Sequence, residues 1–236
     1  MSILDSIKSD HILNRRMIFE VRYHPNPSII DMLGGLINKI IASKLISNAH
    51  WEMGLSDIKI TDGASIFPPT VLTVDHQRFN FNTSTIQTND SFFNAVTKLY
   101  EEITNTSFNI EILRIGCRIQ GSYKCNSKTH ESILKKFSGL YPAQFLFEDF
   151  PVKDTSLTLH YQNGFYVIGP VMENDTFMGA NFPGPDTNLN PGFAIDTDNY
   201  MVRSKEKPTL KIAHFKDVYM ATLAVEKRLF DNLKDL

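Results

Sequence analysis

The sequence has little of several features that identify common classes of protein. Its 236 residues include only two cysteines, Cys117 and Cys125, which argues against a disulfide framework, and two thiols without a matching set of His and Cys residues do not make a zinc site. Lysine and arginine form no run, and the formal net charge is -2, so a dominant phosphate-binding surface is not expected. Nucleic acid is therefore the least favoured class of partner.

Long uninterrupted hydrophobic segments are also missing. The longest apolar stretch, residues 29–46, contains Asp31 and Lys39, which are costly at the centre of a bilayer. Near the N-terminus, Asp5 and Lys8 interrupt the apolar run that a signal peptide needs. These features predict a soluble protein with no membrane segment, and the two free thiols favour the cytoplasm.

No motif in the chain specifies a reaction. The seven histidines lack the His-Glu-x-x-His spacing of zinc hydrolases, and no glycine-rich loop leads into the lysine of a phosphate-binding motif. Cys125 and His130 are close in sequence, but spacing alone does not place a thiol beside a base. We therefore predict no catalytic residue, no cofactor and no metal site, and we favour a protein that is not an enzyme.

The sequence does contain regular strand and helix patterns, and 42% of its residues are hydrophobic, enough for a sizeable core. After a polar lead-in at 1–15, the first half predicts a strand, a helix, about three strands and a helix, at 17–23, 28–46, 57–61, 72–81 and 89–103. The span 72–81 is a hairpin that turns at 75–78, where the apolar positions change phase. Gly34 and Gly35 indicate either close packing of the first helix on a sheet or a tolerated pair.

The second half repeats this order. It predicts a long strand, a short helix, a hairpin, a strand and a final helix, at 108–123, 126–137, 157–171, 193–202 and 212–234. Asn163-Gly164 favours a two-residue type I′ turn in the hairpin. The final helix has a stripe at Phe215, Val218, Thr222, Val225, Leu229 and Leu233. Residues 174–192 form a long polar loop, functional or mobile.

Together these patterns predict an α+β fold. It consists of two pseudo-repeated β-α-βββ-α halves, 1–107 and 108–236, with curved antiparallel sheets and with helices packed on one side. The halves pack together and form either two units or one large domain.

The strand at 113–120 offers the most specific hypothesis about a site. Alternation places Arg114 and Arg118 on the face opposite Ile115, Cys117 and Ile119. Such guanidinium groups need anions if the face is covered, and the later strand carries Asp196 and Asp198 at matching spacing. The four side chains form either a structural ion-pair network or a ligand site. A divalent cation at the two aspartates, and a role for either thiol, are weaker alternatives.

Three segments resemble a known family. These are Arg-Ile-Gly-Cys-Arg-Ile at 114–119, Ala-Ile-Asp-Thr-Asp-Asn-Tyr at 194–200 and Val-Glu-Lys-Arg-Leu-Phe at 225–230. They look like a sporadically distributed family of uncharacterised prokaryotic proteins, and the likeness spans residues 70–236. The resemblance implies no activity. Its patchy distribution suggests a link to defence or toxin–antitoxin operons.

Two hypotheses about function follow. The first is an interaction or regulatory module that binds a protein partner, with exposed aromatics as anchor candidates: Tyr141, Phe145, Phe147, Phe150, Phe177 and Phe182. Core packing is the competing role for these aromatics. The second hypothesis is a small-molecule or nucleotide-binding domain with a pocket between sheet and helix, lined by the arginines and aspartates described above. The oligomeric state is not indicated by the sequence.

Overall fold

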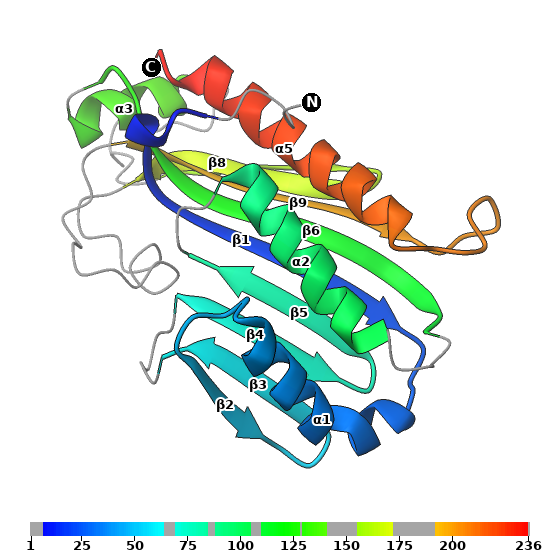
Figure 1. Cartoon of the computed structure of the whole chain (residues 1–236). Helices are drawn as coiled ribbons and strands as arrows, with labels where there is room; N and C mark the ends of the chain where they lie inside the picture. Colours follow the sequence, from blue (N-terminus) through cyan, green and yellow to red (C-terminus); the bar gives the residue numbers. More distant parts are fainter. Residues whose placement is uncertain are drawn as a thin grey trace.

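The computed structural model describes residues 7–63, 69–84, 88–104, 110–127, 129–140, 155–171 and 192–235. Within these ranges the chain forms four α-helices and one open, antiparallel, nine-stranded sheet, shown in Figure 1. The predicted α+β class is therefore confirmed, but a single continuous sheet replaces the separate sheets that were expected.

The strands are β1 Ile12–Tyr23, β2 Ala49–Met53, β3 Asp57–Asp62, β4 Thr70–Asp75, β5 Arg78–Thr83, β6 Ile112–Lys124, β7 Leu157–Tyr161, β8 Gly164–Val171 and β9 Gly192–Val202. The helices are α1 Ser28–Ser43, α2 Asn89–Thr104, α3 His130–Ser138 and α5 Ala213–Leu233. A short 3-10 helix, η1, spans Ser9–His11 and leads directly into β1.

The sheet has the order β2-β3-β4-β5-β1-β6-β9-β8-β7. Its two long central strands, β1 and β6, each open one half of the chain, and they pair with each other over most of their length. The sheet therefore passes without a break across the junction of the two predicted halves. The element orders of the halves differ, because four strands follow α1 and three follow α3.

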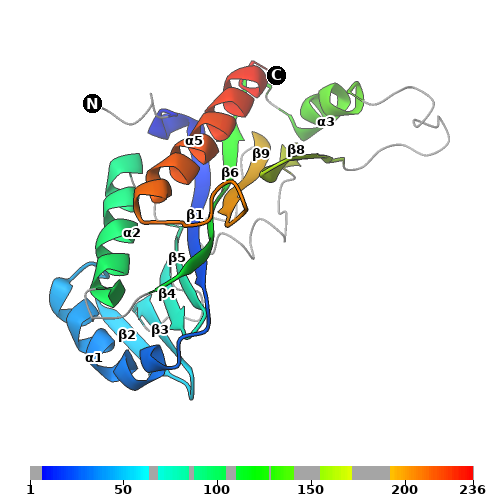
Figure 2. The ribbon, with the colours of Figure 1, turned by 90° about the vertical axis from the view of Figure 1, so that its right-hand side faces the viewer.

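The two faces of the sheet have different coverings. Helices α1, α2 and α5 lie along one face, which we call the helix face, as Figure 2 shows. No helix of the described ranges covers the opposite face, which we call the open face. Alternation divides β1 between them: Met17, Phe19 and Val21 are buried against the helices, whereas Glu20 and Arg22 point to the open face.

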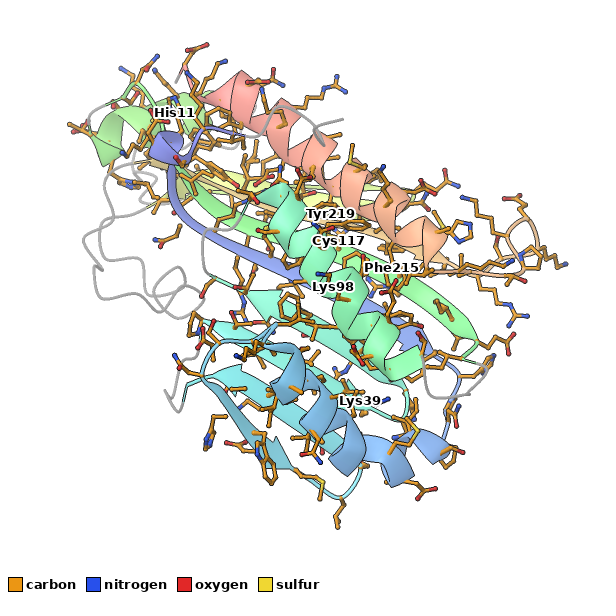
Figure 3. The ribbon with its side chains drawn as sticks, viewed as in Figure 1. His11, Lys39, Lys98, Cys117, Phe215 and Tyr219 are labelled. Carbon is orange, nitrogen blue, oxygen red and sulfur yellow. The ribbon has the colours of Figure 1, made fainter. Side chains whose placement is uncertain are left out.

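Two hydrophobic clusters fill the space between the helix face and the helices. The larger cluster lies under α1, α2 and the first half of α5, where the tilted rings of Phe19 and Phe215 have their centroids 5.0 Å apart. The smaller one joins α3 and the end of α5 to β8 and β9 around Phe193 and Phe230. Figure 3 labels Cys117 of β6 and Phe215 and Tyr219 of α5 in the region where α2 and α5 lie over the sheet.

Several details of the first half differ from the sequence prediction. The span 1–15 is not a lead-in throughout, because β1 already begins at Ile12. The sequence prediction did not include strand β2, although Ala49, Trp51 and Met53 alternate with His50 and Glu52 over its five residues. Gly34 and Gly35 are exposed, and an added Cβ would meet nothing within 4 Å, so the close packing considered for them is wrong.

Two details of the second half also need correction. The β7–β8 hairpin is confirmed, but its two linking residues are Gln162 and Asn163, and neither Asn163 nor Gly164 has a positive φ. The type I′ turn at Asn163-Gly164 is therefore wrong. In α5 the buried stripe passes through Glu226 and Phe230 rather than through Val225 and Leu229. The predicted loop at 174–192 lies outside the described residues except for its last residue.

Candidate functional site

The open face carries a cluster of arginines and carboxylates at the centre of the sheet. It is formed by Glu20 and Arg22 of β1, Arg114 and Arg118 of β6, and Asp196 and Asp198 of β9; we call these six residues the open-face cluster. The three strands are neighbours, and the period of two along each strand directs all six side chains to the same side.

Arg118 forms the strongest pair of this cluster. Its Nε donates to Asp196 Oδ1 at 2.8 Å and its Nη2 donates to Asp196 Oδ2 at 2.5 Å, a bidentate arrangement. The register sets Arg118 directly opposite Asp198, so the pair with Asp196 is diagonal. Gln120 adds a third hydrogen bond to Asp196 Oδ2 at 3.1 Å. The hydrogen bond to Asp196 raises the pKa of Arg118.

Arg114 is shared between two carboxylates. Its Nη1 donates to Glu20 Oε1 at 2.7 Å, while its Nη2 lies 3.7 Å from Asp198 Oδ2. Arg22 also donates to Glu20 Oε1, at 2.8 Å. Glu20 is therefore the main counter-ion of two arginines. The sequence analysis did not include Glu20 or Arg22 in the site, although the alternation of β1 placed both opposite its apolar residues.

Asp198 is the less well neutralised of the two aspartates. Burial raises its pKa above the ordinary value, and Arg114 and Arg118 oppose this effect. The negative charges of Asp196 and Glu20 raise the pKa further. Asp198 therefore retains unused capacity to accept hydrogen bonds, because its nearest cation is 3.7 Å away.

These side chains surround a recess of about 290 Å³ on the open face. Its lining consists of Ile18, Glu20, Arg22, Asn80, Arg114, Gly116, Arg118 and Asp198. Three arginines and two carboxylates line it, and Asp196 beside it balances the charge. The recess lies on the face away from the helices, so the predicted pocket between sheet and helix is corrected to a recess on the open face.

Aromatic rings border the cluster on β8 and β9. The guanidinium of Arg114 lies over the ring of Tyr200, 4.9 Å from its centroid, and that of Arg118 lies 5.6 Å from the centroid of Phe165. Cation–π contacts of this kind hold the guanidinium planes in place without consuming all of their N–H donors. The site therefore presents oriented guanidinium groups next to carboxylates, with apolar ring surface alongside.

The chemistry of the other predicted residues is less suited to a site. Burial raises the pKa of Cys117 to about 12, so its thiol is a core group. Cys125 donates to the carbonyl of Ser127, and His130 lies 3.2 Å from the carbonyl of Val171. No group of three His, Cys, Asp or Glu side chains within the described ranges could hold a metal ion.

The six aromatic residues proposed as partner anchors cannot be placed. Tyr141, Phe145, Phe147, Phe150, Phe177 and Phe182 all lie outside the described residues. Their role remains a prediction from the sequence.

A second charged cluster lies on the helix face and was missed by the sequence analysis. Arg15 donates to Glu226 twice, through Nε at 2.8 Å and Nη2 at 2.6 Å, and to Asn89 Oδ1 at 3.0 Å. Tyr123 donates to Glu226 Oε1 at 2.5 Å, and Tyr219 donates to the carbonyl of Asn89. We call these five residues the buried cluster.

Two signals could have revealed the buried cluster. Arg15 is in phase with Met17 and Phe19 along β1, and Glu226 lies four residues after Thr222 on the buried stripe of α5. Burial disfavours the charge of Arg15, but Glu226 more than compensates and raises the pKa of Arg15 above its ordinary value. The cluster ties α2 and α5 to the central strands.

No protein-family model matches the chain, and no curated protein matches it. The assignment of a function therefore depends on the geometry of the chain itself. Among the described residues, no helix is both long enough and apolar enough to cross a membrane.

Proposed function

We propose that the protein is a non-enzymatic interaction module that binds a protein partner through the open face of its sheet. The observation that carries the proposal is the open-face cluster: six charged side chains from three adjacent strands around a recess, on a face that no described helix covers. Arginine and tyrosine are the residue types most often found at the centre of protein interfaces. The open face presents both residue types together, because the guanidinium of Arg114 lies over the ring of Tyr200.

The chemistry of the cluster indicates which groups the partner offers. The side chain of Arg22 is 56% exposed and has donors that Glu20 does not occupy, so it can receive a partner carboxylate. Asp198 can accept a hydrogen bond from a partner amide or lysine. The complementary surface therefore carries both an acidic group and a hydrogen-bond donor.

The biological setting remains the one suggested by the family resemblance, a regulatory or accessory role in a prokaryotic defence or toxin–antitoxin operon. Co-expression of the chain with the products of its neighbouring genes tests this proposal. A complex is expected to form with one of them. Failure to co-purify any neighbour would remove the support for an operon partner.

Charge reversal on the open face locates the interface. Arg22→Glu is expected to weaken binding of the co-purified partner by about tenfold, because it places a carboxylate where the partner's acidic group docks. Arg228→Glu is the matched control, since Arg228 is exposed on α5, away from the recess. Equal affinities of the two variants would show that the partner binds elsewhere.

A small-molecule site is the second candidate, and the recess is the observation that favours it. Its volume of about 290 Å³ is near the lower end of the range for ligand pockets. Oriented guanidinium groups beside a ring suit a planar anion, such as a carboxylate or a mononucleotide. Isothermal titration with a panel of aromatic carboxylates and mononucleotides tests this alternative. Heat that is abolished by Arg114→Met would support it, whereas no heat from any of them would count against it.

We also propose that the two halves are a pseudo-duplication. Each half supplies one long central strand, then a helix, then antiparallel strands that begin at the sheet edge and step inward to the central strand, and then a closing helix. The unequal strand number is explained if β2 was added to the first half. Related proteins whose first and second halves are similar to each other in sequence would support this proposal.

A further inference from the structure

Strand β2 forms one edge of the sheet and presents unpaired backbone groups. It pairs with β3, and no described residue pairs with its other side. The carbonyl of Asn48 accepts from Gly63 at 3.1 Å, and Gly54 donates to Asp57 at 2.9 Å, so the even-numbered positions from 48 to 54 face β3. By the alternation of a strand, the backbone groups of Ala49, Trp51 and Met53 point outward.

This edge lacks the usual protection against pairing. Exposed edges commonly carry lysine, proline or a bulge, but β2 contains neither residue type and pairs with β3 in unbroken register. Its helix-face side chains are unusually exposed for their type, with Trp51 at 48% and Met53 at 58%. Ile41 of α1 and Leu55 of the following turn are also exposed, at 38% and 100%.

We propose that the chain forms a dimer in which β2 pairs antiparallel with β2 of a second copy, with Trp51 opposite Trp51. The sequence Ala-His-Trp-Glu-Met is complementary to itself in this register. His50 of each copy lies opposite Glu52 of the other, and Ala49 lies opposite Met53. An imidazole faces a carboxylate on the open face, and a small side chain faces a long one on the helix face.

Backbone geometry selects this register. In an antiparallel pair, outward-pointing residues must lie opposite outward-pointing residues. A centre between two residues would place outward-pointing groups opposite inward-pointing ones. A centre at His50 or Glu52 keeps outward groups opposite each other, but it leaves Met53 or Ala49 of each copy without a partner in the five-residue strand. Centring on Trp51 satisfies all three outward residues at once and gives a closed, isologous two-fold contact.

The other edge of the sheet does not have this property. Pairing of β7 with itself about Leu159 would place Thr158 opposite His160, with no opposite charge across the contact. The β2 contact also has a geometric consequence, because its two-fold axis is perpendicular to the sheet. The two open faces would then lie on the same side of one continuous sheet. The dimer is independent of the function proposed above.

Sedimentation equilibrium of the full chain tests the proposal, and Trp51 provides a second readout. The expected species has twice the 26.9 kDa mass of one chain. Trp51 is the only tryptophan, so its fluorescence should shift to shorter wavelength with increasing protein concentration, as its ring leaves water. A monomeric mass at about 100 µM, with emission independent of concentration, would overturn the proposal.

Substitutions at position 50 test the register. His50→Glu sets two carboxylates opposite each other at each end of the contact and is expected to raise the dimer Kd by about tenfold. His50→Lys is the matched variant, because it places a positive charge opposite Glu52 of the other copy. It is expected to lower the Kd. The double variant His50→Glu with Glu52→Lys reverses both charges and should restore dimerisation.

A backbone substitution tests the ladder itself. Trp51→Pro removes the two central N–H donors of the contact, whereas Trp51→Thr keeps them and favours a strand. The proline variant should be monomeric, and the threonine variant should retain a measurable dimer. A dimer that is insensitive to all of these changes would place the contact elsewhere and overturn the proposal. Circular dichroism confirms that each variant is folded.

Discussion

The central strands carry an arginine–carboxylate cluster on each face of the sheet, and the two clusters differ in their surroundings. On the helix face, Arg15 and Glu226 are only 5% and 2% exposed. On the open face, the side chains of Arg114 and Arg118 are 22% and 38% exposed. Both clusters contain a bidentate pair with nearly the same bond lengths.

The difference shows that similar contacts have different consequences according to solvent access. Removal of one partner of a buried pair leaves a charge that water cannot reach, so the buried cluster is needed for the fold. The open-face pairs are partly hydrated, contribute little to stability and can exchange partners with a bound molecule. The buried cluster therefore holds the helices in position, whereas the open-face cluster is available for recognition.

The largest expected effect is the loss of the buried counter-ion. Glu226→Gln leaves Arg15 charged and without a carboxylate, and should lower the free energy of unfolding by roughly 3–5 kcal/mol. Urea denaturation measures the change. The double variant Arg15→Met with Glu226→Leu should recover at least half of the loss, because it removes both charges. A double variant as unstable as the single one would contradict this account.

A pair of glycines on β6 extends the comparison to packing. An alanine Cβ at Gly121 would lie 2.2 Å from the hydroxyl oxygen of Tyr123, a member of the buried cluster. Gly121→Ala should therefore destabilise the protein by about 2–3 kcal/mol. At Gly116 the nearest atom is the flexible end of Arg114, at 3.1 Å, so Gly116→Ala should cost under about 0.5 kcal/mol. Equal thermal stabilities of the two variants would remove this contrast.

The best-formed pair of the open-face cluster should have a modest effect. Asp196→Asn removes the carboxylate that Arg118 and Gln120 share, but water reaches the freed guanidinium. The expected loss is roughly 0.5–1 kcal/mol, and high salt should reduce the difference from the wild type. A loss as large as that of Glu226→Gln would show that the two faces are equivalent.

The smallest effect, with a characteristic pH dependence, is expected at Asp198. The pKa of the Asp198 carboxyl is raised in the folded protein. As the pH rises above the ordinary pKa of about 3.8, the unfolded chain therefore loses the carboxyl proton before the folded protein does. The folded state then loses stability as the pH rises through the raised pKa, and the penalty is complete above it. Asp198→Asn has no such penalty.

The variant should therefore be slightly more stable than the wild type at neutral pH, by under about 1 kcal/mol. Its advantage should shrink as the pH falls toward 3.8. Urea denaturation of both proteins across this pH range provides the measurement. A variant that is less stable at neutral pH would show that the contact between Asp198 and Arg114 outweighs the cost of burial.

Much of the fold could be predicted from periodicity. The alternation of β6 identified the apolar and charged faces correctly, and the phase change between Leu72 and Phe79 located the β4–β5 hairpin. The short helix α3 was also predicted, although it begins at His130, after an N-cap at Thr129 that accepts a hydrogen bond from Ser132. Local patterns determine these features because each depends on residues that are close in sequence.

The candidate site could be predicted only in part. Two strands of opposite charge suggested Arg114 and Arg118 near Asp196 and Asp198, but Glu20 of β1 could not be included without knowing that β1 adjoins β6. The buried cluster was harder to predict, because its pair joins residues separated by 211 positions. A charged residue in an apolar stripe reads as a break in the pattern until its partner is known.

The sequence by itself determined the element types, the apolar face of each central strand and the absence of a recognisable catalytic motif. These properties follow from spacing along one segment of chain. Only the tertiary structure decided the strand order, the counter-ions of each arginine, the recess on the open face and the unprotected edge at β2. These depend on which strands become neighbours, which is fixed by packing between segments that are far apart in the sequence.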